Sequence, residues 1–280
     1  MSISKTWNRV ISAIVVVIVL ALILWPFFYI FVSSFKPLKE IMSRVSFFPK
    51  DPTIRNYSTL LFARTPIRDF IRILSNTLLV STITAAFSIV ISSLSGYSIA
   101  RSRKLKSGLV SRLLLFIYVF PTIIILVPIY KLFTLIGLWD SYVGLIVVYV
   151  ALVSPFCTWL LVSFFDSIPR ELEESSQIDG AGSFTTFMRI VLPLTLPGIV
   201  TVGAYSFITA WGEYMFALVV ISSNQKKTAA LGLATFTAEQ YIEWGPLLAG
   251  SILIIVPVFL LFLPVAKIFI KGFMTGAVKE

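Results

Sequence analysis

The sequence contains no histidine and only one cysteine, Cys157. A chain with a single thiol and no imidazole can build neither a disulfide framework nor a metal site of the Cys/His type. No glycine is followed by lysine, so the Gly-x-x-x-x-Gly-Lys-Ser/Thr loop that binds nucleotide phosphates is absent as well. Cys157 lies within an apolar run and is interpreted as a small buried hydrophobic residue.

Charged residues are scarce too. They make up 13% of the 280 residues, whereas apolar residues make up 58% and the mean hydropathy is +0.95. A soluble domain averages roughly a quarter charged residues. The net charge of +10 would suit nucleic acid if the cations formed patches with exposed aromatics. They stand between apolar runs instead, which predicts contact with lipid head groups and no nucleic-acid partner.

What the chain has in abundance is long apolar runs, which predict an all-α membrane protein. In hydrocarbon every backbone N–H and C=O needs an internal partner, which a helix supplies, and about 20 residues cross a bilayer. We predict a single transmembrane domain over residues 1–280 with about six spans. Their approximate ranges are 10–32, 76–100, 113–130, 143–165, 194–222 and 246–266.

Two of these spans have unusual compositions. The span at 76–100 is rich in Ser, Thr, Ala and Gly, which let helices approach closely, so we expect it inside the bundle. The span at 113–130 contains Pro121 and Pro128, which predict a bend. The bend would lie beside a cavity or would be an ordinary packing kink. Residues 33–75 are expected to form short surface helices.

Basic residues are divided almost evenly between the two sides of the predicted membrane, so their number does not orient the chain. Their density does, because short cation-rich loops stay in the cytoplasm while longer loops cross largely regardless of charge. The densest cluster consists of Arg101, Arg103, Lys104, Lys106 and Arg112. We therefore predict that both termini lie in the cytoplasm.

The connection between the fourth and fifth spans, residues 166–193, is called the helical knob below. Pro169 suits the first turn of a helix, and the glutamates of that turn complement the helix dipole. Gly180 and Gly182 are expected to end this helix. A second helical stretch over 183–191 follows. The plain alternative is a connecting hairpin without further role.

The knob resembles the EAA loop of importer-type ABC transporter permeases, whose pattern is Glu-Ala-Ala, three residues, Gly, nine residues and Ile-x-Leu-Pro. Here Glu174-Ser175-Ser176 is followed by Gly180 at the expected place, and Ile190, Leu192 and Pro193 come after nine intervening residues. Serine replaces both alanines and is small enough to keep that helix face flat.

Further matches narrow the resemblance to carbohydrate-uptake permeases similar to the second maltose-transporter permease. They are Ser-Phe-Lys-Pro at 34–37, Gly-Tyr-Ser-Ile-Ala-Arg at 96–101, Ile-Pro-Arg-Glu-Leu-Glu-Glu at 168–174, Trp-Gly-Glu-Tyr-Met-Phe-Ala at 211–217 and the terminus 276–280. Gly212 stands where the family commonly has asparagine. The resemblance implies the type I ABC importer permease fold.

It also implies that the knob is a coupling helix docked in a cleft of a separate ATPase subunit. The residues implied in this coupling are Glu174, Ser175, Ser176, Asp179, Gly180, Ala181, Ile190, Leu192 and Pro193. The implied partners are a second permease subunit in a heterodimer, two ATP-binding cassette subunits, an extracytoplasmic solute-binding protein and a sugar. This chain would then be no enzyme and would hold no cofactor, because ATP and Mg²⁺ would be bound by the ATPase.

Five residues within the spans are candidates for a sugar path. Aromatic faces stack on sugar rings and polar groups bind the hydroxyls, and an ionisable residue within a span is costly enough to indicate function. The candidates are Trp211, Glu213, Tyr214, Tyr118 and Tyr149. The alternatives are a polar clamp between helices for Glu213 and packing for the aromatics.

Two other functions stay open at this point. One is an ABC permease for a different solute, such as glycerol phosphate, an amino acid or a metal chelate. The other is a secondary transporter or channel driven by an ion gradient, although such proteins often show inverted repeats and none is evident here. A membrane-embedded enzyme fits least, since no activated nucleophile or metal cluster is visible in the sequence.

Overall fold

The structure is a computed structural model of the chain and describes residues 3–43, 46–62, 69–102, 108–238 and 241–276. Arg103, Lys104, Lys106 and the terminus 277–280, which contributed to the predictions above, lie outside these residues. The described chain is helical almost throughout, so the predicted all-α class is confirmed. The exception is a two-stranded antiparallel ribbon of β1 (Thr237–Ala238) and β2 (Tyr241–Ile242), in which Thr237 pairs with Ile242.

The chain divides into two compact units, and the first comprises Met1–Asp69 with Leu233–Val256. It contains α1 (Ile3–Ser34), α2 (Leu38–Ile41), α3 (Arg55–Phe62), the ribbon and the start of α14 (Trp244–Gly276). Asn56 of α3 donates to the carbonyls of Ser34 at 2.8 Å and Lys36 at 3.0 Å. These bonds fold the segment after α1 back onto the end of that helix.

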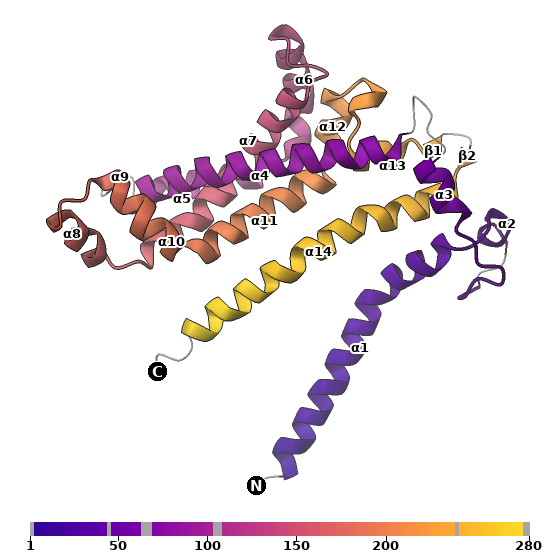
Figure 1. Ribbon diagram of the computed structural model, residues 1–280, viewed down its shortest axis with the longest axis horizontal. Helices are drawn as coiled ribbons and strands as arrows, with labels where there is room; N and C mark the ends of the chain where they lie inside the picture. The colour runs from indigo at the N-terminus through magenta and orange to yellow at the C-terminus, as the bar shows by residue number, and fades with distance from the viewer. Residues whose placement is uncertain (1–2, 44–45, 63–68, 103–107, 239–240, 277–280) are drawn as a thin grey trace. The chain divides into compact units, whose positions relative to one another are not determined.

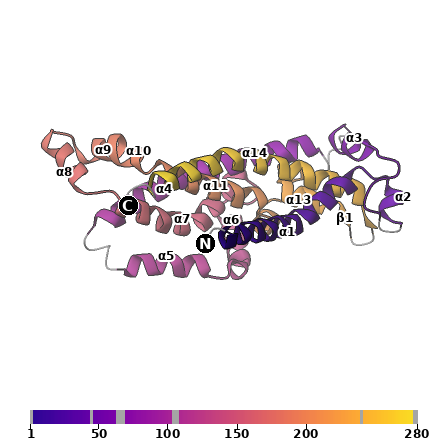
Figure 2. The ribbon, with the colours of Figure 1, turned by 90° about the horizontal axis from the view of Figure 1, so that it is seen from below.

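The second unit, Phe70–Gly232 with Pro257–Glu280, is built around three helices. α4 (Phe70–Arg101) packs against both α7 (Tyr142–Asp166) and α11 (Leu196–Gly212). Figure 1 shows α4 and α11 side by side, and Figure 2 shows α5 (Leu109–Val119) along α7. The other elements are η1 (Thr122–Ile125), α6 (Leu126–Leu135), α8 (Glu171–Ile178), α9 (Ser183–Thr186), the π-helical η2 (Phe187–Val191), α10 (Leu192–Leu194), α12 (Met215–Val220), η3 (Asn224–Lys226) and α13 (Ala229–Ala234).

Small residues explain why these helices approach so closely. A Cβ at Gly96 of α4 would lie 3.1 Å from the Leu161 Cβ of α7, and one at Gly198 of α11 would lie 2.7 Å from the Phe164 ring. The face of α4 that is fully buried carries hydroxyl side chains, namely Ser81, Thr84, Ser88 and Ser92. The expectation that α4 lies inside the bundle is therefore confirmed.

The bend expected in the third apolar run lies at Pro121. α5 ends at Val119, and the run from Thr122 to Leu135 leaves it at an angle of 77°. Phe120 and Pro121 are extended, with ψ of 132° and 104°. Pro128 falls in the first turn of α6, where its missing N–H breaks no helical bond, so it causes no bend.

The fifth apolar run, predicted as one span over 194–222, is not one helix. α11 ends at Gly212, and α12 begins at Met215. Glu213 between them is extended, with ψ of 129°, rather than helical. The reason lies in its side chain, which is described below.

Among the described residues, four helices are long and apolar enough to cross a bilayer. They are Arg9–Ser34, Phe70–Arg101, Tyr142–Asp166 and Trp244–Lys267. Two bent pairs, Leu109–Val119 with Thr122–Leu135 and Ser183–Leu194 with Leu196–Gly212, raise the number to six if each is one crossing.

Candidate functional site

The helical knob begins with α8, whose first turn carries Glu171, Glu173 and Glu174. Their position at the positive end of the helix dipole stabilises the helix. In Figure 1, α8 and α9 lie beyond the end of the α4, α7 and α11 bundle. The tip of the knob therefore projects past the packed helices of its unit.

α8 ends in a complete Schellman motif centred on Gly180. The Gly180 N–H donates to the Gln177 carbonyl and the Ala181 N–H donates to the Ser176 carbonyl, both at 3.0 Å. Gly180 has φ of +87°, a conformation that side chains with a Cβ rarely adopt. Gly180 thus ends the helix, as expected. Gly182 has φ of −70° and ψ of 157°, which any residue can adopt, so it has no part in the turn.

Most of the predicted coupling residues on α8 face outward. Glu174, Ser175 and Asp179 are exposed, whereas Ser176 is buried and its hydroxyl bonds that of Thr186 at 2.9 Å. This bond joins α8 to α9.

Two apolar side chains that the sequence analysis missed flank the turn. Ile178 is 86% exposed and Phe184 is 71% exposed. The sequence did contain a signal for them, since both are apolar residues in an otherwise polar segment. They are the most exposed large apolar side chains of the knob.

The far end of the knob is anchored in the core of the second unit. Phe187 and Val191 are buried against Phe165 and Ile99, and Leu192 packs on the same cluster. Ile190 is half-buried and Pro193 is exposed. Of Ile190, Leu192 and Pro193, only Leu192 packs on this cluster, and the buried residues of the anchor are Phe187 and Val191, which the sequence analysis did not single out.

A further contact joins the knob to the last turn of α4. The Tyr97 hydroxyl donates to Glu173 Oε2 at 2.6 Å, and Arg101 Nε donates to Glu173 Oε1 at 2.6 Å. The Arg101 and Glu173 side chains are both largely shielded from solvent. No spacing rule links residues 97 and 101 to residue 173, so the sequence offered no signal for this contact.

Glu213, a predicted path residue, holds two helices together. Its carboxylate accepts from the N–H groups of Phe216 and Ala217 at 2.9 and 3.1 Å, which begin α12, and from the buried Tyr149 hydroxyl at 2.8 Å. The extended conformation of Glu213 ends α11, and its side chain bonds the first turn of α12 across Tyr214. The structure thus supports the polar-clamp interpretation of Glu213.

The remaining predicted path residues divide between two places. Tyr214 packs with Tyr149 in the core cluster, and the buried Trp211 stacks on Phe207 with ring centroids 5.3 Å apart. Tyr118 is 41% exposed and contacts a different set of side chains.

Tyr118 belongs to an aromatic cluster formed with Phe156, Trp159 and Tyr205. The Phe156 ring centroid lies 4.9 Å from that of Tyr118, 4.6 Å from that of Tyr205 and 5.9 Å from that of Trp159. The Tyr205 hydroxyl donates to the Tyr118 hydroxyl at 3.4 Å. Three helices, α5, α7 and α11, contribute to this cluster, and the sequence analysis named only Tyr118.

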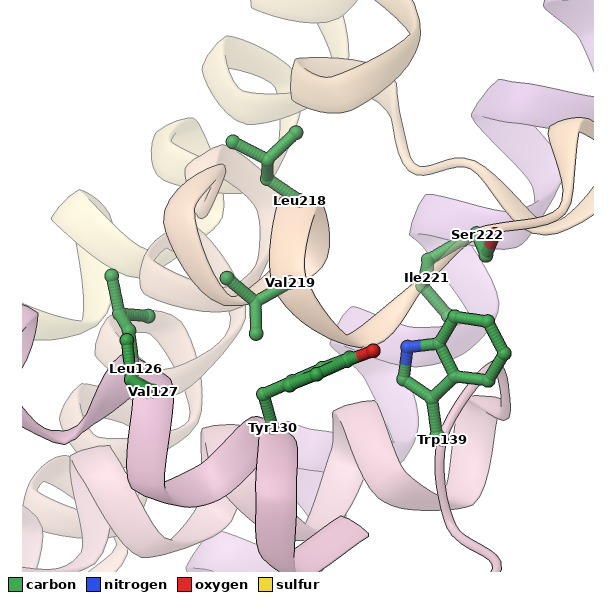
Figure 3. A pocket seen from close by; sticks show the side chains of 8 residues that line it. All are labelled: Leu126, Val127, Tyr130, Trp139, Leu218, Val219, Ile221 and Ser222. Atoms are coloured by element: carbon green, nitrogen blue, oxygen red, sulfur yellow. The ribbon is translucent and has the colours of Figure 1, made fainter. Parts of the chain in front are cut away.

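A pocket of about 400 Å³ lies at the opposite end of α7 from the knob. Figure 3 shows its lining residues, Leu126, Val127, Tyr130, Trp139, Leu218, Val219, Ile221 and Ser222. The Tyr130 and Trp139 rings meet edge to face, with centroids 6.2 Å apart. This pocket is almost entirely apolar and contains no residue predicted from the sequence.

Asp140 follows the pocket residue Trp139 and binds the segment that follows α12. Its carboxylate accepts from the N–H groups of Ser222 and Ser223, both at 2.9 Å, from the Ser223 hydroxyl, and from Lys226 Nζ at 3.0 Å. Burial alone would raise the pKa of Asp140. The bonds from Ser223, Ser222 and Lys226 outweigh it and hold that pKa well below its ordinary value.

Comparison with known proteins decides what this arrangement is. Residues 88–271 match the family described as binding-protein-dependent transport system inner membrane component. The chain belongs to this family. It is thus a transporter permease subunit of the inner membrane, as the EAA-loop resemblance predicted.

Relatives cover nearly the whole permease. The sulfoquinovosyl glycerol transport system permease protein SmoH of Agrobacterium fabrum is 32% identical over 257 residues, which are 91% of this chain and 89% of SmoH. The trehalose/maltose transport system permease protein MalG of Thermococcus litoralis is 29% identical, over 97% of both chains. A bacterial ABC transporter that imports the acidic polysaccharide alginate has the same fold, with a TM-score of 0.79 and 20% identity, over 95% of this chain and 98% of that one.

Proposed function

We propose that this permease forms half of the translocation path of an ATP-driven importer for a sugar or an oligosaccharide. Its similarity to permeases for sulfoquinovosyl glycerol and for trehalose and maltose supports a carbohydrate cargo. The observation that carries the proposal is the helical knob. Its turn is fixed by Gly180, and its tip exposes Ile178 and Phe184.

The knob is proposed to dock in a cleft of a cytoplasmic ATPase subunit, which places both termini on the cytoplasmic side. Ile178 and Phe184 would enter the cleft and lose their contact with water, which stabilises the complex. Glu174, Ser175 and Asp179 would form its polar rim. The knob is stiff enough for this role, because the Schellman turn and the Ser176–Thr186 bond hold it together.

The partners follow from what this chain lacks. Without a P-loop it requires ATPase subunits to bind ATP and Mg²⁺, and we propose two of them together with a second permease subunit. A structure of the alginate transporter contains a periplasmic protein that carries the sugar, which supports a solute-binding partner here. Closure of the ATPases around ATP would bring the knobs together and turn the path outward. Each ligand shifts this equilibrium only by its different affinity for the two states.

For the path itself we propose the aromatic cluster of Tyr118, Phe156, Trp159 and Tyr205. Its members present ring faces and two hydroxyls, the combination that carbohydrate sites use. Glu213, Tyr149, Tyr214 and Trp211 would shape the path from behind by holding the break between α11 and α12 in place.

The test is reconstitution of the permease with its partner subunits in proteoliposomes. Uptake should require ATP and the binding protein and should survive collapse of ion gradients. Ile178→Glu should abolish co-purification of the ATPase, whereas Gln177→Glu, a change at an exposed neighbouring position, should preserve it. Uptake that follows an ion gradient, or an ATPase that is retained equally by both variants, would contradict the proposal.

A further inference from the structure

Glu173 differs from the other glutamates of α8 because it is buried. It is 7% exposed, whereas Glu171 and Glu174 lie in solvent. Burying a carboxylate is costly unless it is paired and hydrogen-bonded. Both oxygens of Glu173 are paired with groups on α4, namely the Tyr97 hydroxyl, Arg101 Nε and Arg101 Nη2, the last at 2.5 Å.

The two partners stand four residues apart on α4 and so share one face of that helix. The Glu173 carboxylate therefore binds two side chains that lie one helical turn apart on α4. This fixes the rotation of the α4 terminus as well as its distance from the knob. Two weaker bonds lie nearby, from Arg101 Nη2 to the Ile168 carbonyl at 3.3 Å and from Arg170 Nη2 to the Ala100 carbonyl at 3.4 Å.

Aromatic packing keeps Tyr97 in position for this contact. Its ring centroid lies 4.7 Å from that of Phe187 at the far end of the knob and 5.7 Å from that of Phe165 at the end of α7. The Arg101 guanidinium lies 5.8 Å from the Tyr97 ring centroid. Both ends of the knob thus meet the same turn of α4.

We propose that Glu173 is the positioning residue that transmits movement of the knob to α4, with Tyr97 and Arg101 as the groups that receive it. This inference rests on the proposed coupling function of the knob. The knob joins α7 and α11 through the chain, but it reaches α4 only through side chains. α4 also packs against α7 and α11, and the bonds to Glu173 are shorter than the other two hydrogen bonds between the knob and α4.

The experiment compares ATP hydrolysis with sugar uptake in the reconstituted complex. Breaking one side of a buried ion pair is strongly destabilising to that contact, so Glu173→Gln and Arg101→Gln should lower the sugar transported per ATP by about tenfold or more. ATP hydrolysis should change by no more than about twofold, because the exposed docking surface is intact. Tyr97→Phe, which removes one hydroxyl only, should give an intermediate loss.

Glu171→Gln on the same helix is the matched control and should change neither quantity. Combining Glu173→Gln with Arg101→Gln should restore part of the lost stoichiometry, because removing both charges leaves no buried charge unpaired. The inference would be overturned if uptake and ATP hydrolysis fell by the same factor in Glu173→Gln and Arg101→Gln. It would also be overturned if the sugar transported per ATP were unchanged in these variants and in Tyr97→Phe. Failure of the docking proposal is seen separately, as retention of the ATPase by Ile178→Glu.

Discussion

At the scale of single residues, the turn of the helical knob depends on one backbone conformation. Replacing Gly180 by valine puts a β-branched side chain at φ of +87° and costs on the order of 1–3 kcal/mol of local strain. We expect Gly180→Val to insert and assemble in the membrane but to lose ATP-driven uptake. Transport assays on membranes with matched permease content measure this.

Gly182→Val is the matched control for this prediction. A Cβ at either glycine meets no other atom within 4 Å, so the two variants differ in backbone conformation rather than in crowding. Gly182→Val should retain uptake. Equal activity of the two variants would show that the left-handed turn has no role in coupling.

The aromatic cluster supplies a second prediction at this scale. Tyr118→Ala removes the ring that stacks on Phe156. We expect half-maximal uptake to require about a tenfold higher sugar concentration, which corresponds to a loss of about 1.4 kcal/mol in sugar binding. Tyr118→Phe keeps the ring and should stay within about threefold of the original value. If Tyr118→Ala leaves the concentration dependence unchanged, the cluster does not line the path.

At the scale of elements, Asp140 ties the connection between α6 and α7 to the segment after α12. Its pKa is lower in the folded protein than in the unfolded chain. The stability it contributes is therefore present above the ordinary pKa of about 4 and is lost as the pH falls through the lower folded value. In detergent, the thermal unfolding temperature of Asp140→Asn should lie below that of the original protein by the same amount from pH 8 to about pH 5.

That margin should shrink only in stronger acid. A margin that already changes between pH 8 and pH 6 would show that another group controls the stability of this connection.

The same elements show what can be predicted from sequence. The bend at Pro121 could be predicted, because proline cannot continue a helix and the residue before it prefers to be extended. The break at Glu213 could not be predicted, because apolar residues continue on both sides of it. Only the three-dimensional contact with Tyr149 and α12 makes the extended conformation favourable. The contact between Glu173 and α4 could not be predicted for a related reason. Its partners lie more than seventy residues away in sequence.

At the scale of the whole molecule, the orientation of the chain is open to a direct test. The one native cysteine, Cys157, is fully buried, so Cys157→Ser gives a background free of reactive thiols. Ser175→Cys in the knob and Asn224→Cys at the other end of the second unit are both at exposed positions. We expect an impermeant maleimide to label Ser175→Cys only in inside-out vesicles and Asn224→Cys only in right-side-out vesicles.

Labelling of Ser175→Cys from the outer side would place the knob away from any ATPase and contradict the coupling proposal. The sequence predicted the number of apolar runs and the family, because both depend on local composition and motif spacing. The side of the membrane depended on cations that are almost evenly divided, so this part needs the measurement.

The hydroxyl-bearing face of α4 has one more consequence. Ser81, Thr84, Ser88 and Ser92 are buried without a hydrogen-bond partner among the described residues. Contacts of this kind are held by dispersion alone, which is weak for each atom pair and has no preferred direction. α4 can therefore shear by a fraction of a turn along its neighbours without rupturing any directional bond at these four positions, and small sliding of packed helices is one established way for a protein to change state.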